Sequence, residues 1–173
     1  MNDRTDVALL SALETDARVS FADLGEKVGL SKSACWSRVR TLEQSGVIRR
    51  YIADIEPAAV GLEIRAWVQI TVNARKHAEF EAAILEHPNV LECYTTAGQA
   101  DYVLHVLAAN IGALDGLLRG ELAKLPGAER IATTVCMKTI KARGSVMACA
   151  ARAAVASKGD ALQLQTPSSR SRR

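Results

Sequence analysis

The chain has 173 residues, of which 49% are hydrophobic and 24% are charged, and its formal net charge is +3. This length fits one or two small domains with a real core, and no apolar run approaches the roughly 20 residues that a membrane-spanning helix needs. The polar, acidic start MNDRTD is unlike a signal peptide. We therefore expect a cytoplasmic protein with no membrane partner.

Charge is unevenly distributed along the sequence. Residues 1–60 carry eight basic and nine acidic side chains, residues 61–137 carry six and nine, and residues 138–173 carry eight and one. The middle of the chain is therefore unsuited to nucleic acid, whereas the two ends could bind it.

The cysteines indicate a protein with reduced thiols and no bound metal. All four are far apart and none belongs to a CxxC pair: they are Cys35, Cys93, Cys136 and Cys149. Such spacing argues against a zinc site or a disulfide framework. We expect no metal site and no cofactor.

A stretch near the N-terminus, residues 20–46, predicts two short helices joined by a tight turn. Ser20 is a candidate N-cap and is followed by an apolar face at helical spacing. Gly29 suits the left-handed residue that ends a helix, and Ser31 is placed to cap the next one. An amphipathic pattern over residues 7–13 predicts a supporting helix. We therefore expect three helices that include a helix-turn-helix.

The second helix of this pair has one apolar and one polar, cationic face. Cys35, Val39 and Leu42 recur at i, i+4 and i+7 and should face inward. The outward face is short-chained, polar and basic, which suits the major groove of DNA. With two arginines from the segment that follows, the predicted DNA-contacting residues are Lys32, Ser33, Trp36, Ser37, Arg38, Arg40, Arg49 and Arg50.

Other interpretations remain open for this stretch. An ordinary helical pair in a core, with solvated charges, would share its spacing. Trp36 could pack against a neighbouring element instead of touching DNA, and Arg38 could pair with Glu43 or a nearby Asp. Six Lys or Arg against one acid between Lys27 and Arg50 favour the DNA-binding interpretation.

The next segment, VIRRYIADI, is rich in β-branched residues and carries two arginines. It predicts a short strand that forms a wing beside the DNA backbone. The winged helix-turn-helix domain then spans residues 1–55, and a linker follows over residues 56–61.

Residues 62–143 predict a second domain with alternating strands and helices. Strict alternation over Leu62–Val72 indicates a strand with one buried face. The further expected elements are a helix at 75–87, strands at 90–96 and 100–108, a helix at 111–125 and a strand at 130–141. The order βαββαβ predicts an α+β, ferredoxin-like sheet with both helices on one face.

The other face of this sheet would be uncovered. Trp67, Gln69 and Thr71 lie on it, too mixed for a core and too aromatic for open solvent. A second copy of the same sheet is the expected cover, so we expect a homodimer, which also suits the reading of a palindromic DNA site.

Residues 144–173 form a separate C-terminal segment. Residues 147–156 are alanine-rich and could form a helix, and from Ser157 onward the sequence is typical of a basic, disordered tail.

Two separated segments resemble one known family. GLSKSACWSRVRTLEQSGVI resembles the DNA-binding segment of the Lrp/AsnC (feast/famine) transcription regulators, and ECYTTAGQADYVLHV with LPGAERIATTVCMKTIK resembles their second domain. The resemblance covers about residues 3–141. It implies a winged helix-turn-helix joined to a ligand-sensing domain that dimerises through its sheets and often assembles into octamers.

The resemblance also implies double-stranded DNA and a small-molecule effector, an amino acid or related metabolite, as partners. Gly98, Asp101, Tyr102, Thr133 and Met137 match the family pattern, whereas the acid that often follows the glycine is replaced here by Gln99. The predicted effector-binding residues are Thr96, Gly98, Gln99, Asp101, Tyr102, Thr133 and Thr134.

Within this set, backbone amides and hydroxyls suit an α-carboxylate, and Asp101 suits an α-ammonium group. Asp101 could instead only cap its turn. Because Gln99 replaces an acid, we expect an uncharged or apolar ligand side chain to be tolerated better than a cationic one.

Two alternatives differ in class from a DNA-binding regulator. One is a metabolite sensor whose helix-turn-helix no longer binds DNA. The other is an enzyme similar to haem-pathway decarboxylases, which would need histidines near a cavity. The histidines available are His77, His87 and His105, each on a predicted helix or strand. No P-loop, GxGxxG or HExxH pattern occurs, so we do not expect an enzyme.

Overall fold

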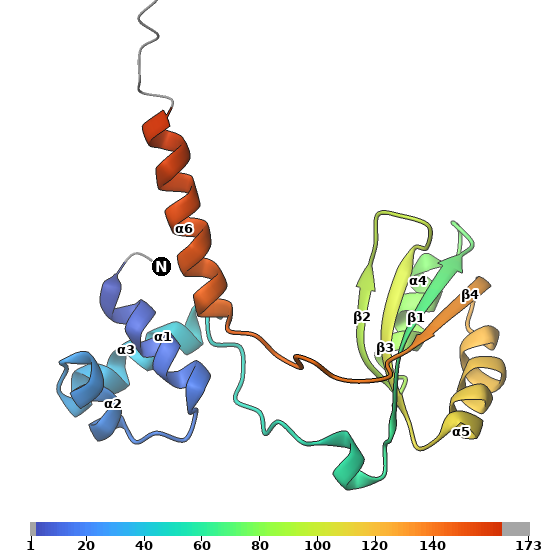
Figure 1. Ribbon diagram of the computed structural model, residues 1–173, viewed down its shortest axis with the longest axis horizontal. Coiled ribbons are helices and arrows are strands. Elements are labelled where there is room, and N and C mark those ends of the chain that lie inside the picture. The colour runs from blue at the N-terminus through green and yellow to red at the C-terminus, as the bar shows by residue number, and fades with distance from the viewer. Residues whose placement is uncertain (1–2, 164–173) are drawn as a thin grey trace, which may run out of the picture. The chain divides into compact units, whose positions relative to one another are not determined.

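The computed structural model describes residues 3–163, which fold into two compact units (Figure 1). Within the described residues, one unit combines 3–53 with 141–163, and the other spans Asp54–Ile140. None of the helices within the described residues is long and apolar enough to cross a membrane.

The first unit contains the three predicted helices around a small core. They are α1 (Arg4–Thr15), α2 (Phe21–Val28) and α3 (Lys32–Gln44). Their fully buried side chains come from all three helices: Leu9, Leu24, Cys35 and Val39. Burial of Cys35, Val39 and Leu42 confirms the inward face predicted for α3.

The turn between α2 and α3 forms as its sequence predicts. Gly29 ends α2 in the left-handed conformation with φ 71°, which a side chain would disfavour. Ser31 then caps α3, since its side chain accepts a hydrogen bond from the backbone N–H of Ala34 at 3.3 Å. Gly25 adds a constraint that the sequence did not reveal: a Cβ there would lie 2.6 Å from the carbonyl oxygen of Leu30. The backbone of α2 therefore lies too close to the turn before α3 for a side chain at position 25.

The predicted wing strand is not formed. Residues 47–55 are irregular, although Ile48 packs against the helical core. A strand needs a neighbour to complete its ladder of hydrogen bonds, and no other described segment pairs with this one. Its larger apolar side chains stay exposed, namely Val47, Tyr51, Ile52 and Ile55.

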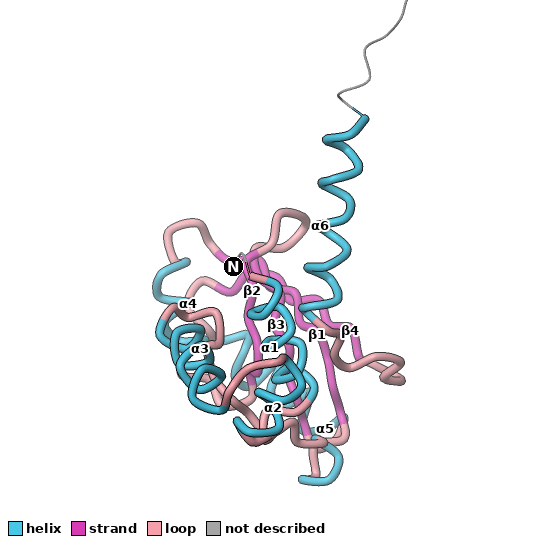
Figure 2. Tube along the Cα trace, turned by 90° about the vertical axis from the view of Figure 1, so that its left-hand side faces the viewer, coloured by secondary structure: helices cyan, strands magenta, loops and turns pink. Residues whose placement is uncertain are grey.

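A helix from the far end of the chain completes this unit. The helix α6 (Val146–Gln163) extends beyond the alanine-rich residues 147–156, so the predicted disordered tail is wrong for residues 157–163. The rest of the expected tail, 164–173, lies outside the described residues. Figure 2 shows α6 as one continuous helix.

The start of α6 is bound to the end of α1 through Glu14. The Glu14 carboxylate accepts hydrogen bonds from the Ser145 hydroxyl and the Val146 N–H, both at 2.6 Å, and from the Met147 N–H at 3.2 Å. Ser145 itself caps α6 by accepting from the Ala148 N–H at 2.9 Å. Free N–H groups and the positive end of the helix dipole favour a carboxylate at this position.

The second unit is a four-stranded antiparallel sheet with helices on one face. Its elements are η1 (Pro57–Val60), β1 (Ile64–Val72), α4 (His77–Leu85), β2 (Val90–Thr95), β3 (Tyr102–Ala108), α5 (Ile111–Gly116), η2 (Leu117–Glu121), η3 (Leu122–Lys124) and β4 (Ala128–Val135). The strand order is β2-β3-β1-β4, so β1 is central (Figure 1). This arrangement confirms the predicted βαββαβ fold.

Alternation along β1 divides the sheet into two faces. Ala66, Val68 and Ile70 are fully buried in one core with Phe80 of α4 and Leu114 of α5. The opposite face, which we call the outer sheet face, carries Trp67, Gln69 and Thr71 of β1 with their cross-strand partners on β3 and β4. It is covered by no other described element of the second unit.

Two elements differ from their predicted form. The expected helix over 111–125 is interrupted, because η2 is a π-helical turn. In a π-turn, residues five apart share a face, which turns both Leu117 and Leu122 into the core. The last strand ends at Val135 and not at Lys141, although one further hydrogen bond follows it, from the Cys136 N–H to the Arg65 carbonyl oxygen at 2.8 Å.

The contact through Glu14 generates a stability prediction. Glu14→Ala should remove the contact that holds the first turn of α6. Amide hydrogen exchange at Val146 and Met147 should then become faster, because the free energy of local opening falls by about 0.5–1 kcal/mol. The hydroxyl of Ser145, followed by the backbone donors, lowers the pKa of Glu14 below its ordinary value of 4.5. The stabilisation should therefore be present above about pH 4.5 and be lost as the pH falls through the lowered pKa.

Glu26→Ala, on an exposed position of α2, is the matched control and should leave exchange in α6 unchanged. Equal exchange at Val146 in wild type and Glu14→Ala would contradict the contact.

Candidate DNA-binding surface and effector site

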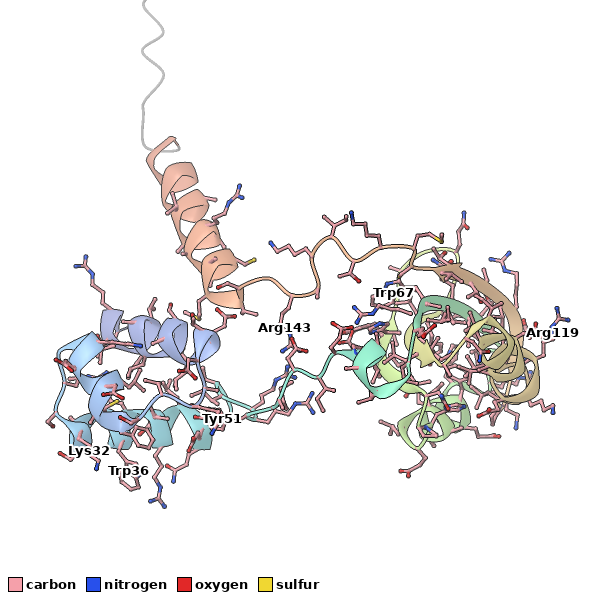
Figure 3. The ribbon with its side chains drawn as sticks, turned by 60° about the horizontal axis from the view of Figure 1, so that its bottom comes forward. Lys32, Trp36, Tyr51, Trp67, Arg119 and Arg143 are labelled. Atoms are coloured by element: carbon pink, nitrogen blue, oxygen red, sulfur yellow. The ribbon has the colours of Figure 1, made fainter. Side chains whose placement is uncertain are left out.

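The helix α3 presents the predicted polar, cationic face to solvent. Ser33, Ser37 and Arg40 are exposed on it, and Figure 3 shows Lys32 and Trp36 pointing away from the body of the unit on the same side of the helix. Because Ser31 is the N-cap, Lys32 and Ser33 lie in the first turn of α3, where free backbone N–H groups can meet a phosphate.

Trp36 and Arg40 lie against each other on this face. The Arg40 guanidinium carbon is 5.1 Å from the centre of the Trp36 ring, and Trp36 is 46% exposed. The ring therefore packs neither in the core nor under another element. A cation–π contact at an exposed site contributes about 0.5–1 kcal/mol, so it can hold the guanidinium in position without burying its N–H donors.

Arg38, by contrast, is occupied within the unit. Its Nη1 atom forms ion pairs with Asp6, at 2.9 Å, and with Asp3 at the start of α1. These carboxylates raise the pKa of Arg38, with Asp6 the larger cause. The pKa of Asp3 is lowered, first by the Thr5 backbone N–H and then by Arg38. The geometry supports the alternative in which Arg38 pairs with nearby aspartates.

The basic segment after α3 is exposed but has no strand to carry it. Arg49 and Arg50 are both solvent-exposed in the irregular region. Next to them, the Tyr51 hydroxyl donates to Glu43 at 2.8 Å, and burial together with Glu43 raises the pKa of Tyr51 to about 12. Glu43 is thus bound to Tyr51, a partner that sequence reasoning missed.

The predicted effector turn lies at the end of the hairpin formed by β2 and β3. A cavity of about 350 Å³ opens there, beside residues of the outer sheet face. Its lining residues are Gln69, Thr96, Ala97, Gly98, Gln99, Ala100 and Val103. The structure therefore brings together Thr96, Gly98 and Gln99 of the predicted set. A ligand can approach Gly98 closely, because a Cβ added to it would meet no other atom within 4 Å.

Asp101 and Tyr102 do not line this cavity. The Asp101 carboxylate accepts the Val72 N–H at 2.8 Å and so fixes the hairpin to the end of β1. Tyr102 points to the helical side, where its hydroxyl donates to Glu81 at 2.7 Å and lies 2.9 Å from Nδ1 of His77. Burial and then Glu81 raise the pKa of Tyr102 to about 12.

The two predicted threonines of β4 lie away from the turn. Thr133 is paired with Val68 and belongs to the helix-covered face, whereas Thr134 is paired with Trp67 on the outer sheet face. Neither lines the cavity within this chain. Successive side chains of a strand point to opposite faces of the sheet, so two neighbouring threonines cannot line the same site.

Arg130 is a residue at this site that sequence reasoning missed. It stands opposite Thr71 at the start of β4, and its Nη2 atom donates to the carbonyl oxygen of Gln99 at 3.1 Å. The two residues are separated by 31 positions, so only the pairing of β4 with β1 brings them together.

The three histidines are dispersed and do not form a common site. His77 contacts Tyr102, His87 lies 3.3 Å from Glu121, and His105 is stacked on Trp67 with ring centres 4.7 Å apart. Within the described residues no group of three or more His, Cys, Asp or Glu side chains is arranged to hold a metal ion.

Comparison with known proteins matches both units. Residues 3–43 match the family described as AsnC-type helix-turn-helix domain, and residues 65–146 match the Lrp/AsnC ligand binding domain. Transcriptional regulatory protein DoeX of Halomonas elongata is 37% identical over 142 residues, which cover 80% of this chain and 90% of that protein. The leucine-responsive regulatory protein of Salmonella typhimurium is 34% identical over 142 residues, covering 80% and 87%.

The fold is shared with solved structures. The NMB0573/L-Met complex from Neisseria meningitidis has a TM-score of 0.81 and 28% sequence identity, over 84% of this chain and 96% of that one. An AsnC family transcriptional regulator from Agrobacterium tumefaciens has a TM-score of 0.77 and 32% identity, over 83% and 95%.

A helix-turn-helix followed by a ligand-binding domain defines this protein as a DNA-binding transcriptional regulator with a sensing domain. The chain belongs to the Lrp/AsnC family. This is a family of transcriptional regulators, so the decarboxylase-like alternative is wrong, and the matches give no support to a sensor that has lost DNA binding. The matched ligand-binding domain ends at Val146, where α6 begins.

The different surroundings of Arg40 and Arg38 predict different effects. Arg40→Ala should weaken binding to a specific site by about 1–3 kcal/mol and relax base preference, because its guanidinium is exposed on α3. Arg38→Ala should mainly lower the stability of the helical unit, because it removes the ion pairs with Asp3 and Asp6. Fluorescence anisotropy on specific and scrambled DNA, with thermal unfolding of each variant, measures both. A larger loss of base preference in Arg38→Ala than in Arg40→Ala would reverse this assignment.

Proposed function

We propose that α3 reads base edges in the major groove of an operator, with Arg40, Ser33 and Ser37 toward the bases and Lys32 at a phosphate. The observation that supports this most directly is the exposed pair of Trp36 and Arg40, held together at 5.1 Å on the outward face of α3. Exposed Ser and Arg side chains along the outward face of α3 match the chemistry of guanine edges and phosphates.

Arg49 and Arg50 are assigned to the DNA backbone. They are exposed in the irregular segment that follows α3, and exposed arginines commonly contact phosphate oxygens. Arg50→Ala should therefore weaken binding to all sequences alike and reduce the slope of log K against log salt by about one unit. Titrations of specific and non-specific DNA at several salt concentrations test this. An unchanged slope would remove Arg50 from the backbone contact.

The regulator is proposed to respond to an amino acid bound at the turn between β2 and β3. The related structure from Neisseria meningitidis is a complex with L-Met, and the cavity in this chain is lined by neutral side chains. Because Gln99 stands where many members have an acid, an uncharged amino acid is preferred over a cationic one.

Calorimetric titration of the protein with each of the twenty amino acids tests which of them binds. Selection of genomic DNA fragments by the protein, with and without the amino acid that binds most tightly, tests whether this effector changes DNA binding. Binding of lysine or arginine in preference to leucine or methionine would contradict the proposed preference. An absence of binding by every amino acid would place the effector outside this class.

The outer sheet face is proposed to bind a second copy of the chain, giving a dimer that can assemble further into an octamer. Trp67 is 36% exposed on this face, and its ring stacks on the buried His105 ring with an interplanar angle of 20°. Flat, partly apolar sheet faces are commonly buried against another sheet. A two-fold dimer would present two copies of α3 to a palindromic site.

Trp67→Glu should dissociate this dimer, because a carboxylate would be buried without a partner in the interface. Ile140→Glu is the control, since Ile140 is 84% exposed and lies beyond the end of β4. Light scattering at micromolar concentration measures the mass of both variants. A Trp67→Glu protein with wild-type mass would exclude this face as the interface.

A further inference from the structure

The charged side chain that hydrogen-bonds to the effector turn is a cation. Arg130 donates from Nη2 to the carbonyl oxygen of Gln99 at 3.1 Å, and no other charged side chain hydrogen-bonds to residues 96–100 in the part of the chain that the structure describes. The residues that line the cavity are all neutral. Arg130 therefore offers this turn a partner for an anionic group.

The acid nearest to the turn is already used inside the fold. The Asp101 carboxylate accepts the Val72 N–H at 2.8 Å, and the backbone N–H of Asp101 donates to the Ile70 carbonyl oxygen at 3.1 Å. Turning this carboxylate toward a ligand would leave the Val72 N–H without its partner at the end of the central strand, which is costly for a partly buried group. Asp101 is therefore a poor partner for the ammonium group of an amino acid.

The hydroxyl at the turn is also engaged. Thr96 donates from Oγ1 to the Ala100 carbonyl oxygen at 2.6 Å, so its proton is not available to a carboxylate. Arg130, on the other hand, has five N–H donors, and one of them is used on Gln99. An exposed guanidinium with free donors, bonded to a residue that lines the cavity, matches the bidentate geometry of a carboxylate.

We propose that Arg130 binds the carboxylate of the effector and that the amino group contributes little to recognition. The site then selects small carboxylic acids with an uncharged side chain, so an α-keto acid binds about as well as the amino acid with the same side chain. This inference rests on the proposed location of the effector at the turn. It adds that the carboxylate of the effector determines which molecules bind.

Calorimetry with two sets of probes tests this. Each set consists of the amino acid, its amide and its α-keto acid, for L-leucine and for L-methionine. For wild type we expect the amide to bind at least tenfold more weakly than the amino acid, and the α-keto acid to bind within about threefold of it, because one charge-assisted bidentate contact is lost only in the amide.

Variants separate recognition from structural support. Arg130→Gln should bind the amino acid at least tenfold more weakly, leave the amide unchanged and so abolish the discrimination between them, whereas Arg130→Lys should retain part of it. Arg119→Gln is the control, because Arg119 is paired with Asp115 and Figure 3 shows it on the helical part of the second unit. If Arg130 only supported the turn, acid and amide would weaken together.

The outcomes distinguish this inference from the proposed function. Gly98→Val should fill the approach to the turn and remove binding of every probe, and unchanged binding in that variant would refute the location itself. If Gly98→Val removes binding but Arg130→Gln keeps the full preference for acid over amide, the role of Arg130 is overturned alone. Binding of the amino acid with no binding of its α-keto acid would show that the ammonium group is essential and overturn the inference as well.

Discussion

The alternation of side chains along β1 is the constraint on which the second unit depends. This strand pairs with β3 on one side and β4 on the other, so its two faces become the two faces of the whole sheet. Ala66, Val68 and Ile70 bind the helices to one face through apolar burial. The same alternation directs Trp67 and Gln69 to the outer sheet face, where the cavity at the effector turn opens.

Internal pairing decides which charged groups are available for ligands. Arg38 and Arg40 are two positions apart on one helix, yet the first is bound to Asp3 and Asp6 while the second lies exposed on Trp36. Asp101 is likewise held by the Val72 N–H, whereas Arg130 keeps free donors beside Gln99. In both units the group with an internal partner serves the fold, and an exposed arginine keeps donors for a ligand. We propose that this ligand is a base edge of DNA for Arg40 and a carboxylate for Arg130.

The contact at Glu14 shows how one carboxylate can join distant parts of the chain. A negative charge near the C-terminal end of α1 is unfavourable for that helix by itself, because the carbonyl groups there already carry partial negative charge. The N-terminal end of α6 has the opposite polarity, and its free N–H groups reverse the sign of the interaction. The helix-turn-helix unit thereby includes a helix from beyond the matched family domains.

The sequence by itself determined the local features of this protein. Cap residues and Gly29 specify the turn between α2 and α3, and period-two or helical spacing specifies β1 and α4, because these signals depend on near neighbours in the chain. Only the tertiary structure decided the rest. The wing segment lacks a strand because no described segment pairs with it. At the turn between β2 and β3, the pairing of β4 with β1 brings Arg130 to Gln99, and the Val72 N–H at the end of β1 binds the Asp101 carboxylate. Hydrogen bonds between residues that are about 30 or more positions apart follow from strand pairing, which no local pattern in a single sequence encodes.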